Sequence, residues 1–346
     1  MWFFSRIVII GTMQLIVPIT PIVLQKYHLE LAPNFIHQIN WELFSHWDGK
    51  WYKNIVTLGY EYVNNDHDHN IAFFPLFPLV TKGVMLLGFS FEVAGTLVNN
   101  LAFLGAGFLI YYWIKQRNGI ICARWVIAVL VWCPYSLFAT VTYSEGLFLL
   151  LTAASLRAFE KRQHIMAACL GAMATGTRIT GVALIPAFLL VAWKERRLRI
   201  AYIASFAVGG GLLLFSLYCT LHFGDPLAFV HAQKTWGAVG FVWSWLTTLE
   251  LSWVFVLTCL FGYLLWHLRQ ELSPVAVNYG FCSLILVLAS GRPSSIPRLF
   301  YGTVPLILAL GIFFAQYPRL GFSVIGLFGI LLIHVALQFS QWEWVG

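Results

Sequence analysis

Charged residues are scarce in this sequence. Asp, Glu, Lys and Arg together make up 10% of its 346 residues, whereas ordinary soluble domains carry about 25%. Hydrophobic residues make up 60%, more than the core of a soluble protein of this length needs. This composition argues against an ordinary soluble protein and predicts an all-α polytopic membrane protein.

The chain also lacks features that would divide it. No Ser/Pro-rich linker, low-complexity segment or convincing internal repeat separates one part from another. Its six cysteines include no Cys-x-x-Cys pair, which argues against a disulfide framework and against a cysteine-based metal site. We therefore predict a single transmembrane domain over residues 1–346.

Apolar runs that could span a bilayer recur along the chain. A spanning helix needs about 20 apolar residues, and the sequence offers about eleven candidates, some of them short. The first is interpreted as a retained helix, because it lacks the small-residue cleavage site of a signal peptide. The predicted spans are 2–24, 92–114, 124–141, 145–159, two within 165–193, 200–222, 251–268, 275–290, 299–316 and 321–339.

Basic residues between these spans indicate the orientation. Lys and Arg accumulate on the cytoplasmic side of membrane proteins, and basic clusters occur within 115–124, 157–162 and 194–199. Placing all three inside puts the N-terminus inside and leaves a large first outer loop at about 25–91. Segment 72–89 then fits a helix lying in the outer interface. The net charge of +7 thus serves orientation, and we expect no nucleic-acid partner.

The first outer loop holds an acid among aromatic residues, in the stretch SHWDGKWYKNIVTLGYEY that begins at Ser45. A carboxylate such as Asp48 can take a proton from an attacking hydroxyl group, and aromatic faces suit the C–H groups of a sugar. Trp47, Trp51 and Tyr52 are therefore candidates for a sugar pocket. The alternatives are that Asp48 caps a helix and that the rings form an interfacial belt.

The predicted outer turns add further polar side chains. Arginine binds phosphate through a planar fork of donors, and Arg178 lies in an apolar stretch where an unpaired charge would be costly. Arg292 and Arg298 flank a Pro/Ser turn and are candidate phosphate ligands. Glu145 is a second candidate catalytic acid, although acids are also common at helix starts. The other candidate substrate-binding residues are Tyr143, Gln233 and Trp236.

Aspartate and histidine alternate over residues 66–69. Such an alternation in a loop has no specific ligand geometry by itself, so a solvated loop is the favoured interpretation. No metal ligand is assigned from the sequence.

Several of these candidates lie in segments that resemble the PIG-V family, the GPI mannosyltransferase 2 group. The segments are HWDGKWYKNIVTLGYEY, NIAFFPLFPLV, PYSLFATVTYSEGLFLL, GTRITGVALIP, GDPLAFVHAQKTWG and IPRLFYGTVPLI, in this order over about residues 41–310. The family looks like a branch of the GT-C membrane glycosyltransferases, so the resemblance implies that fold, with interfacial helices in the first outer loop. It also implies that Asp48 matches the catalytic acid of that loop.

The resemblance further implies a reaction. We expect transfer of mannose from polyprenyl- or dolichyl-phosphate mannose to a glycolipid or glycan acceptor, on the periplasmic, extracellular or ER-lumenal face of the bilayer. With Asp48 as general base and the lipid phosphate as leaving group, the sugar configuration inverts. Some GT-C enzymes use a divalent metal, so metal dependence stays open, and no cofactor is firmly implied. His46 departs from the resemblance, which leads us to expect Arg there.

Other functions remain open at this point. A GT-C enzyme for another polyprenyl-phosphate sugar would carry the same groups. A transporter or flippase for a lipid-linked saccharide would also bind phosphate, but transporters usually hold their polar site near the bilayer midplane, often between inverted repeats. Here the predicted polar residues gather at one face and no repeat is evident, which favours the transferase.

Overall fold

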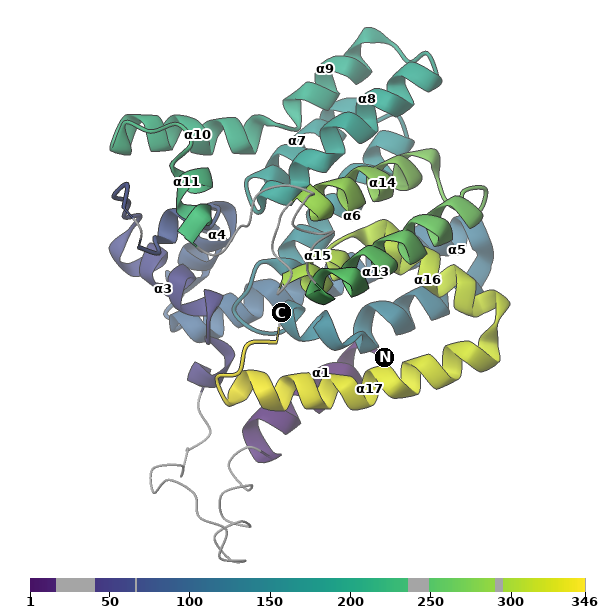
Figure 1. The fold of residues 1–346 in the computed structure, drawn as a ribbon, viewed down its shortest axis with the longest axis horizontal. Helices are drawn as coiled ribbons and strands as arrows, with labels where there is room; N and C mark the ends of the chain where they lie inside the picture. The colour runs from purple at the N-terminus through teal and green to yellow at the C-terminus, as the bar shows by residue number, and fades with distance from the viewer. Residues whose placement is uncertain (17–40, 66, 236–248, 290–294, 346) are drawn as a thin grey trace, which may run out of the picture.

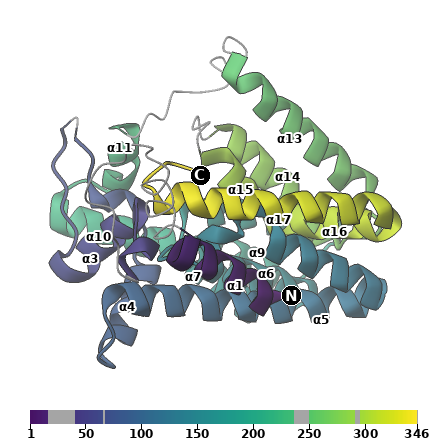
Figure 2. The same ribbon diagram turned by 90° about the horizontal axis from the view of Figure 1, so that it is seen from below.

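The computed structural model describes residues 1–16, 41–65, 67–235, 249–289 and 295–345. Within these ranges the chain forms helices and irregular segments but no strand, which confirms the predicted all-α class. In both views (Figures 1 and 2) α5 (Phe91–Trp132) and α17 (Pro318–Ser340) run along the long axis of the molecule. Helices α3 (Asp48–Leu58), α4 (Leu76–Met85) and α11 (Ala228–Thr235) gather at one end.

The remaining helices complete the bundle between these elements. The helix α1 packs beside α17 and α5, and the segment from α6 to α9 follows α5 along the chain. Their bounds are α1 (Trp2–Gly11), α6 (Glu145–Glu160), α7 (His164–Thr175), α8 (Leu184–Lys194), α9 (Arg199–Ala207), α10 (Gly210–Phe223), α13 (Leu249–His267), α14 (Pro274–Ala289), α15 (Ile296–Tyr301) and α16 (Val304–Gln316).

Two helices of the described residues, α5 and α17, are long and apolar enough to cross a bilayer. The pair α9 and α10, bent by 41°, would make a third if it counts as one span. The other apolar helical stretches counted in the described part are 10–17 residues long, and for α13 this stretch is Trp253–His267. The predicted count of about eleven spans is therefore not confirmed.

Part of this difference comes from α5, which counts as one long helix although the sequence predicts two spans there. The predicted spans 92–114 and 124–141 lie on either side of Gly119, where α5 is interrupted with a φ of 87° and a ψ of 174°. The prediction of helix as far as 141 was wrong, because α5 ends at Trp132. Pro134 then opens a 3-10 helix, Pro134–Ala139, and a proline disfavours helical backbone at the residue before it.

Large apolar side chains are exposed over much of the helical surface. Examples on separate helices, each 58% to 72% exposed, are Phe108, Ile203, Leu214, Ile285 and Phe322. A soluble monomer rarely shows such extensive apolar surface. The arrangement suits helices whose outer faces contact lipid, as the composition predicts.

The helix α6 separates two polar ends of the bundle. Its 16 residues correspond to about 24 Å at 1.5 Å per residue. Glu145 lies at its start, and at the far end Glu160 pairs with Arg157 at 2.9 Å and with Arg117 at 3.3 Å. Nearby, Arg197 donates a hydrogen bond to the Phe159 carbonyl. Members of all three basic clusters thus meet at the end of α6 opposite Glu145.

A buried arginine on α1 fixes the turn that leads into α6. Arg6 is 3% exposed and donates from Nη1 to the Ser136 carbonyl at 2.9 Å. Its Nη2 donates to Ser136 Oγ at 2.9 Å and to the Val131 carbonyl at 3.2 Å. These bonds satisfy both the guanidinium and turn carbonyls that would otherwise be costly to bury.

Candidate functional site

Asp48 lies in the interior of the protein, at the start of α3. Asp48 is its first residue and is 8% exposed, and the preceding Trp47 has a positive φ of 52°, a conformation that bulky residues rarely adopt. Trp47 holds the N-cap position of this helix and Asp48 is its first helical residue, so Asp48 is not the N-cap. Tyr52 and Ile55 follow at helical spacing and are buried on the same face.

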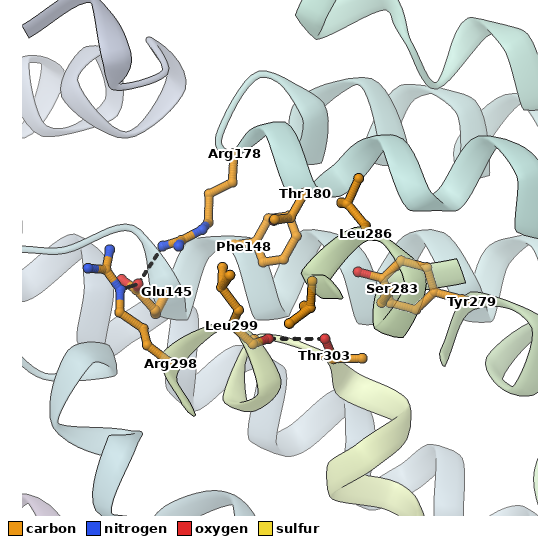
Figure 3. Close-up of a pocket in the computed structure, with 12 residues that line it drawn as sticks. Glu145, Phe148, Arg178, Thr180, Tyr279, Ser283, Leu286, Arg298, Leu299 and Thr303 are labelled. Carbon is orange, nitrogen blue, oxygen red and sulfur yellow. Dashed lines mark hydrogen bonds and ion pairs between the residues drawn. The ribbon is translucent and has the colours of Figure 1, made fainter. Parts of the chain in front are cut away.

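Arg298, on α15, joins the two candidate acids. Its Nη1 lies 2.6 Å from Oδ2 of Asp48, and its Nε donates a hydrogen bond to Oε1 of Glu145. Arg178, which precedes the 3-10 helix Ile179–Ala183, donates from Nη1 to the same Glu145 oxygen. Figure 3 shows both guanidinium groups converging on Glu145. Two acids and two arginines from four segments thus form one charged cluster.

The ion pairs of this cluster are buried, so the charge of each group affects the pKa of its partners. Glu145 is 1% exposed and Arg298 is 6% exposed. Burial by itself would lower the pKa of Arg298, but the charges of Asp48 and Glu145 outweigh it and raise that pKa above its usual value. The guanidinium therefore stays protonated, and the cluster carries two positive and two negative charges when both acids are ionised.

The turn before α6 packs against the charged cluster. Tyr143 Oη accepts a hydrogen bond from the Asp48 backbone N–H at 3.2 Å, and its ring lies 4.8 Å from the Arg298 guanidinium carbon. Tyr52 Oη donates to Ser144 Oγ at 3.0 Å. Tyr143 is therefore a wall of the cluster rather than part of an open pocket.

Asp48 and Glu145 are each followed by a glycine, and the lack of a side chain there lets a neighbouring segment pack closely against the backbone. A Cβ on Gly49 would lie 2.6 Å from Thr142 Oγ1, and one on Gly146 would lie 2.3 Å from the Asn99 carbonyl oxygen. Both distances are far below van der Waals contact. The Gly146 N–H also donates to Asn99 Oδ1 at 2.7 Å, which fixes the start of α6 against α5.

A cavity of about 360 Å³ opens in front of the cluster; we call it the site cavity. It combines aromatic walls with charged and hydroxyl groups, as a sugar phosphate site would need. Its lining comprises Trp47, Asp48, Trp51, Tyr52, Ala72, Phe73, Phe74, Thr177, Arg178, Ile179, Thr180, Gln233, Ser295, Arg298, Leu299 and Trp344.

A second, much smaller void lies behind the arginines. It measures about 10 Å³, room for roughly one water molecule, and Glu145 lines it together with Phe148 and Leu286. Figure 3 shows these apolar side chains between the charged group and the more distant Tyr279 and Ser283. A sugar does not fit there, so the site cavity is the candidate binding site.

The structure brings together most of the residues predicted from the sequence. Seven of them line the site cavity: Trp47, Asp48, Trp51, Tyr52, Arg178, Gln233 and Arg298. Tyr143 and Glu145 lie behind them. Trp236 and Arg292 fall outside the described residues, so their predicted roles have no structural counterpart here.

The loop with alternating aspartate and histidine stays on the surface. His67 and Asp68 are exposed, His69 pairs with Asn65 Oδ1 at 2.7 Å, and Asp66 is outside the described residues. Among the residues that the structure describes, no group of three His, Cys, Asp or Glu side chains could hold a metal ion.

Sequence reasoning missed several residues of the cavity. Thr177, Thr180 and Ser295 add hydroxyl groups to its lining, and Trp344 adds an indole from beyond the last predicted span. The threonines flank Arg178 in the sequence, which could have suggested them. Trp344 carried no such signal, because only the fold brings the segment after α17 back to Trp47 at the start of α3.

Comparison with known proteins agrees with this arrangement. The model of the mannosyltransferase (PIG-V) family matches residues 7–206. The chain is 30% identical to human GPI alpha-1,6-mannosyltransferase 2 over 175 residues, which cover 44% of this chain and 33% of the human protein. The match thus spans about a third of the length of that relative. Asp48, Glu145 and Arg178 fall within the range of the family model. The chain therefore belongs to the PIG-V family of mannosyltransferases.

Proposed function

We propose that this protein is a multi-pass membrane glycosyltransferase of the GT-C type. In this proposal it transfers mannose from polyprenyl- or dolichyl-phosphate mannose to a hydroxyl group of a glycolipid or glycan. The observation that carries the proposal is the convergence of Asp48, Arg178 and Arg298 on one cavity with aromatic walls. The human relative, a GPI alpha-1,6-mannosyltransferase by name, supports mannose as the sugar.

In the proposed reaction Asp48 is the general base. Its carboxylate takes the proton from the acceptor hydroxyl as that oxygen forms a bond to the anomeric carbon of mannose. The bond from this carbon to the phosphate oxygen breaks, and the lipid phosphate leaves with the electron pair. Attack opposite the leaving group inverts the sugar configuration. Arg298 contacts Oδ2 of Asp48, and the other carboxylate oxygen receives the proton.

The arginines are proposed to bind the donor phosphate. Charge grows on the phosphate as the bond to the sugar breaks, and positioned guanidinium groups stabilise it. The Arg178 side chain is 16% exposed, against 7% for Arg298, so Arg178 is the more accessible ligand. Glu145 is buried behind both and holds them in place, which makes it a positioning residue in this mechanism.

The membrane arrangement of the proposal follows from the two ends of α6. The basic clusters meet at one end and the site lies about 24 Å away at the other. The positive-inside rule places the basic end in the cytoplasm, which puts the site cavity at the outer face. We keep about eleven spans as part of this proposal, with short helices included and α4 in the outer interface.

A donor panel tests the proposed function. The purified full chain in liposomes is incubated with polyprenyl-phosphate mannose, glucose or arabinose and a mixed glycolipid acceptor fraction, and product is measured by mass spectrometry. Transfer of mannose with inverted configuration is expected. Transfer of only another sugar would reassign the donor. Movement of a lipid-linked sugar across the bilayer, with no transfer from any donor, would replace the enzyme by a transporter.

A further inference from the structure

The segment after α17 returns to the candidate site. Residues Trp342 to Val345 follow the last helix (yellow in Figure 1) and turn back toward the start of α3. Trp344 lines the site cavity. Val345 packs against a buried cluster that includes Phe44 and Phe138. This segment lies beyond residues 7–206, which the family model matches.

Trp342 anchors the segment. Its ring stacks on His46 with centroids 3.6 Å apart, and Lys50 Nζ lies 4.0 Å from its centroid, within the range of a cation–π contact. Its φ of 65° is unusual for a bulky residue and needs such contacts to hold it. His46 in turn approaches the Phe339 carbonyl through Nδ1 at 2.9 Å. The segment is therefore tied both to the loop before α3 and to the end of α17.

Trp344 presents its indole to the cavity instead. It is 37% exposed and meets Trp47 edge to face, with centroids 5.5 Å apart and ring planes at 76°. Trp47 also lines the cavity. The two indoles, nearly at right angles, form a corner in the lining of the site cavity, which we call the indole corner.

The order of contacts places this corner relative to the charges. Glu145 contacts Arg178 and Arg298, and Arg298 contacts Asp48. Asp48 is preceded in the chain by Trp47, which contacts Trp344. In this series of contacts, Asp48 links the arginines to the indole corner. If the donor phosphate occupies the arginine end, the acceptor hydroxyl must reach Asp48 from the other side.

We propose that Trp344 and Trp47 bind the acceptor, by packing on a pyranose ring that carries the attacking hydroxyl. An aromatic face is electronegative and attracts the weakly positive C–H groups on one side of a pyranose, and the second indole limits the ring's tilt. The inference rests on the proposed function, and it adds the chemical class of acceptor unit, a hexopyranoside, and a specificity residue outside the matched family segment.

The test measures binding separately from transfer. The full chain is kept in a detergent without a sugar headgroup, and octyl α-D-mannopyranoside is titrated as the probe, with 1-octanol as the control for the alkyl tail. Dissociation constants come from calorimetry and ligand contacts from saturation-transfer NMR. We compare the wild type with Trp344→Ala, Trp344→Leu, Trp344→Phe and the exposed control Trp193→Ala.

The expected result is a loss of affinity that depends on the aromatic ring. Trp344→Ala and Trp344→Leu should weaken mannoside binding about ten-fold, Trp344→Phe should retain most of it, and Trp193→Ala should bind like the wild type. In a transfer assay Trp344→Ala should raise KM for the mannoside and leave kcat nearly unchanged.

Two outcomes would overturn the inference. One is a folded Trp344→Ala protein that binds the mannoside as tightly as the wild type; the other is a wild type that binds it no better than 1-octanol. Failure of the proposed function would look different, because mannoside binding would then depend on Trp344 while no polyprenyl-phosphate sugar supported transfer.

Discussion

Arg298 Nη1 lies 2.6 Å from Asp48 Oδ2, and this ion pair joins the start of α3 to α15, about 250 residues further along the chain. Both side chains are largely buried. A buried ion pair gains little net stability over a well-packed apolar pair, because both charges lose their hydration. Its retention at the wall of a cavity fits a functional role better than a structural one.

Replacing Glu145 by Gln should destabilise the protein. Arg178 and Arg298 would lose the oxygen they share, and breaking a buried ion pair by removing one partner costs about 3 to 5 kcal/mol. A lower melting temperature in detergent, measured by intrinsic fluorescence, checks this. Glu61→Gln, on the exposed surface, is the matched control and should melt like the wild type; equal melting of both variants would contradict the shared role of Glu145.

Replacing Gly146 by Ala should push α6 away from α5. The new Cβ would lie 2.3 Å from the Asn99 carbonyl oxygen, and such overpacking costs about 1 to 3 kcal/mol. Gly326→Ala is the control, because a Cβ there meets nothing within 4 Å and alanine favours the helix by about 0.4 to 1 kcal/mol. In thermal melting, Gly146→Ala should lower the melting temperature and Gly326→Ala should raise it. A Gly146→Ala protein as stable as the wild type would contradict the close approach of α6 to α5.

Acid should loosen α11 from the segment that holds Tyr62. Asp225 Oδ2 contacts His231 Nδ1 at 2.7 Å and accepts from Tyr62 Oη at 3.0 Å, and Oδ1 accepts from the Leu227 N–H at 2.9 Å. Burial alone would raise the pKa of Asp225, but these hydrogen bonds outweigh it and lower the pKa. Burial and the bond to Asp225 raise the pKa of Tyr62 to about 12, so the tyrosine remains a donor throughout.

The sign of the pH effect follows from the lowered pKa of Asp225. The stabilisation is present above the ordinary aspartate pKa of about 4 and is lost as the pH falls through the lower folded-state pKa. Hydrogen exchange over α11, corrected for intrinsic rates, should show protection at neutral pH and its loss below about pH 4. Asp225→Asn should abolish this dependence, and a pH response that persists in that variant would assign it to another group.

The sequence was informative where polar residues stand out from an apolar chain. Asp48, Arg178 and Arg298 could be identified because a charge in such surroundings is costly without a partner or a task. The structure groups all three at one cavity. The family could be identified for a related reason, since the segments around these residues keep their order along the chain.

Pairings between distant segments could not be predicted in the same way. Nothing in local sequence shows that one Glu145 oxygen serves two arginines, that Arg6 fixes the turn before α6, or that Trp344 reaches Trp47. The bend between α9 and α10 was also missed, because hydropathy shows that a segment is apolar but not where its helix bends. Such features depend on tertiary packing rather than on periodicity.

The most direct test of the account is the rate of mannose transfer by Asp48→Asn in liposomes, at saturating polyprenyl-phosphate mannose and with donor binding measured in parallel. Asparagine keeps the shape of the side chain but cannot accept the proton. We predict a fall in kcat of at least about 100-fold with donor affinity retained. A folded Asp48→Asn protein that transfers mannose at a rate within about two-fold of the wild type would contradict the role of this carboxylate as general base.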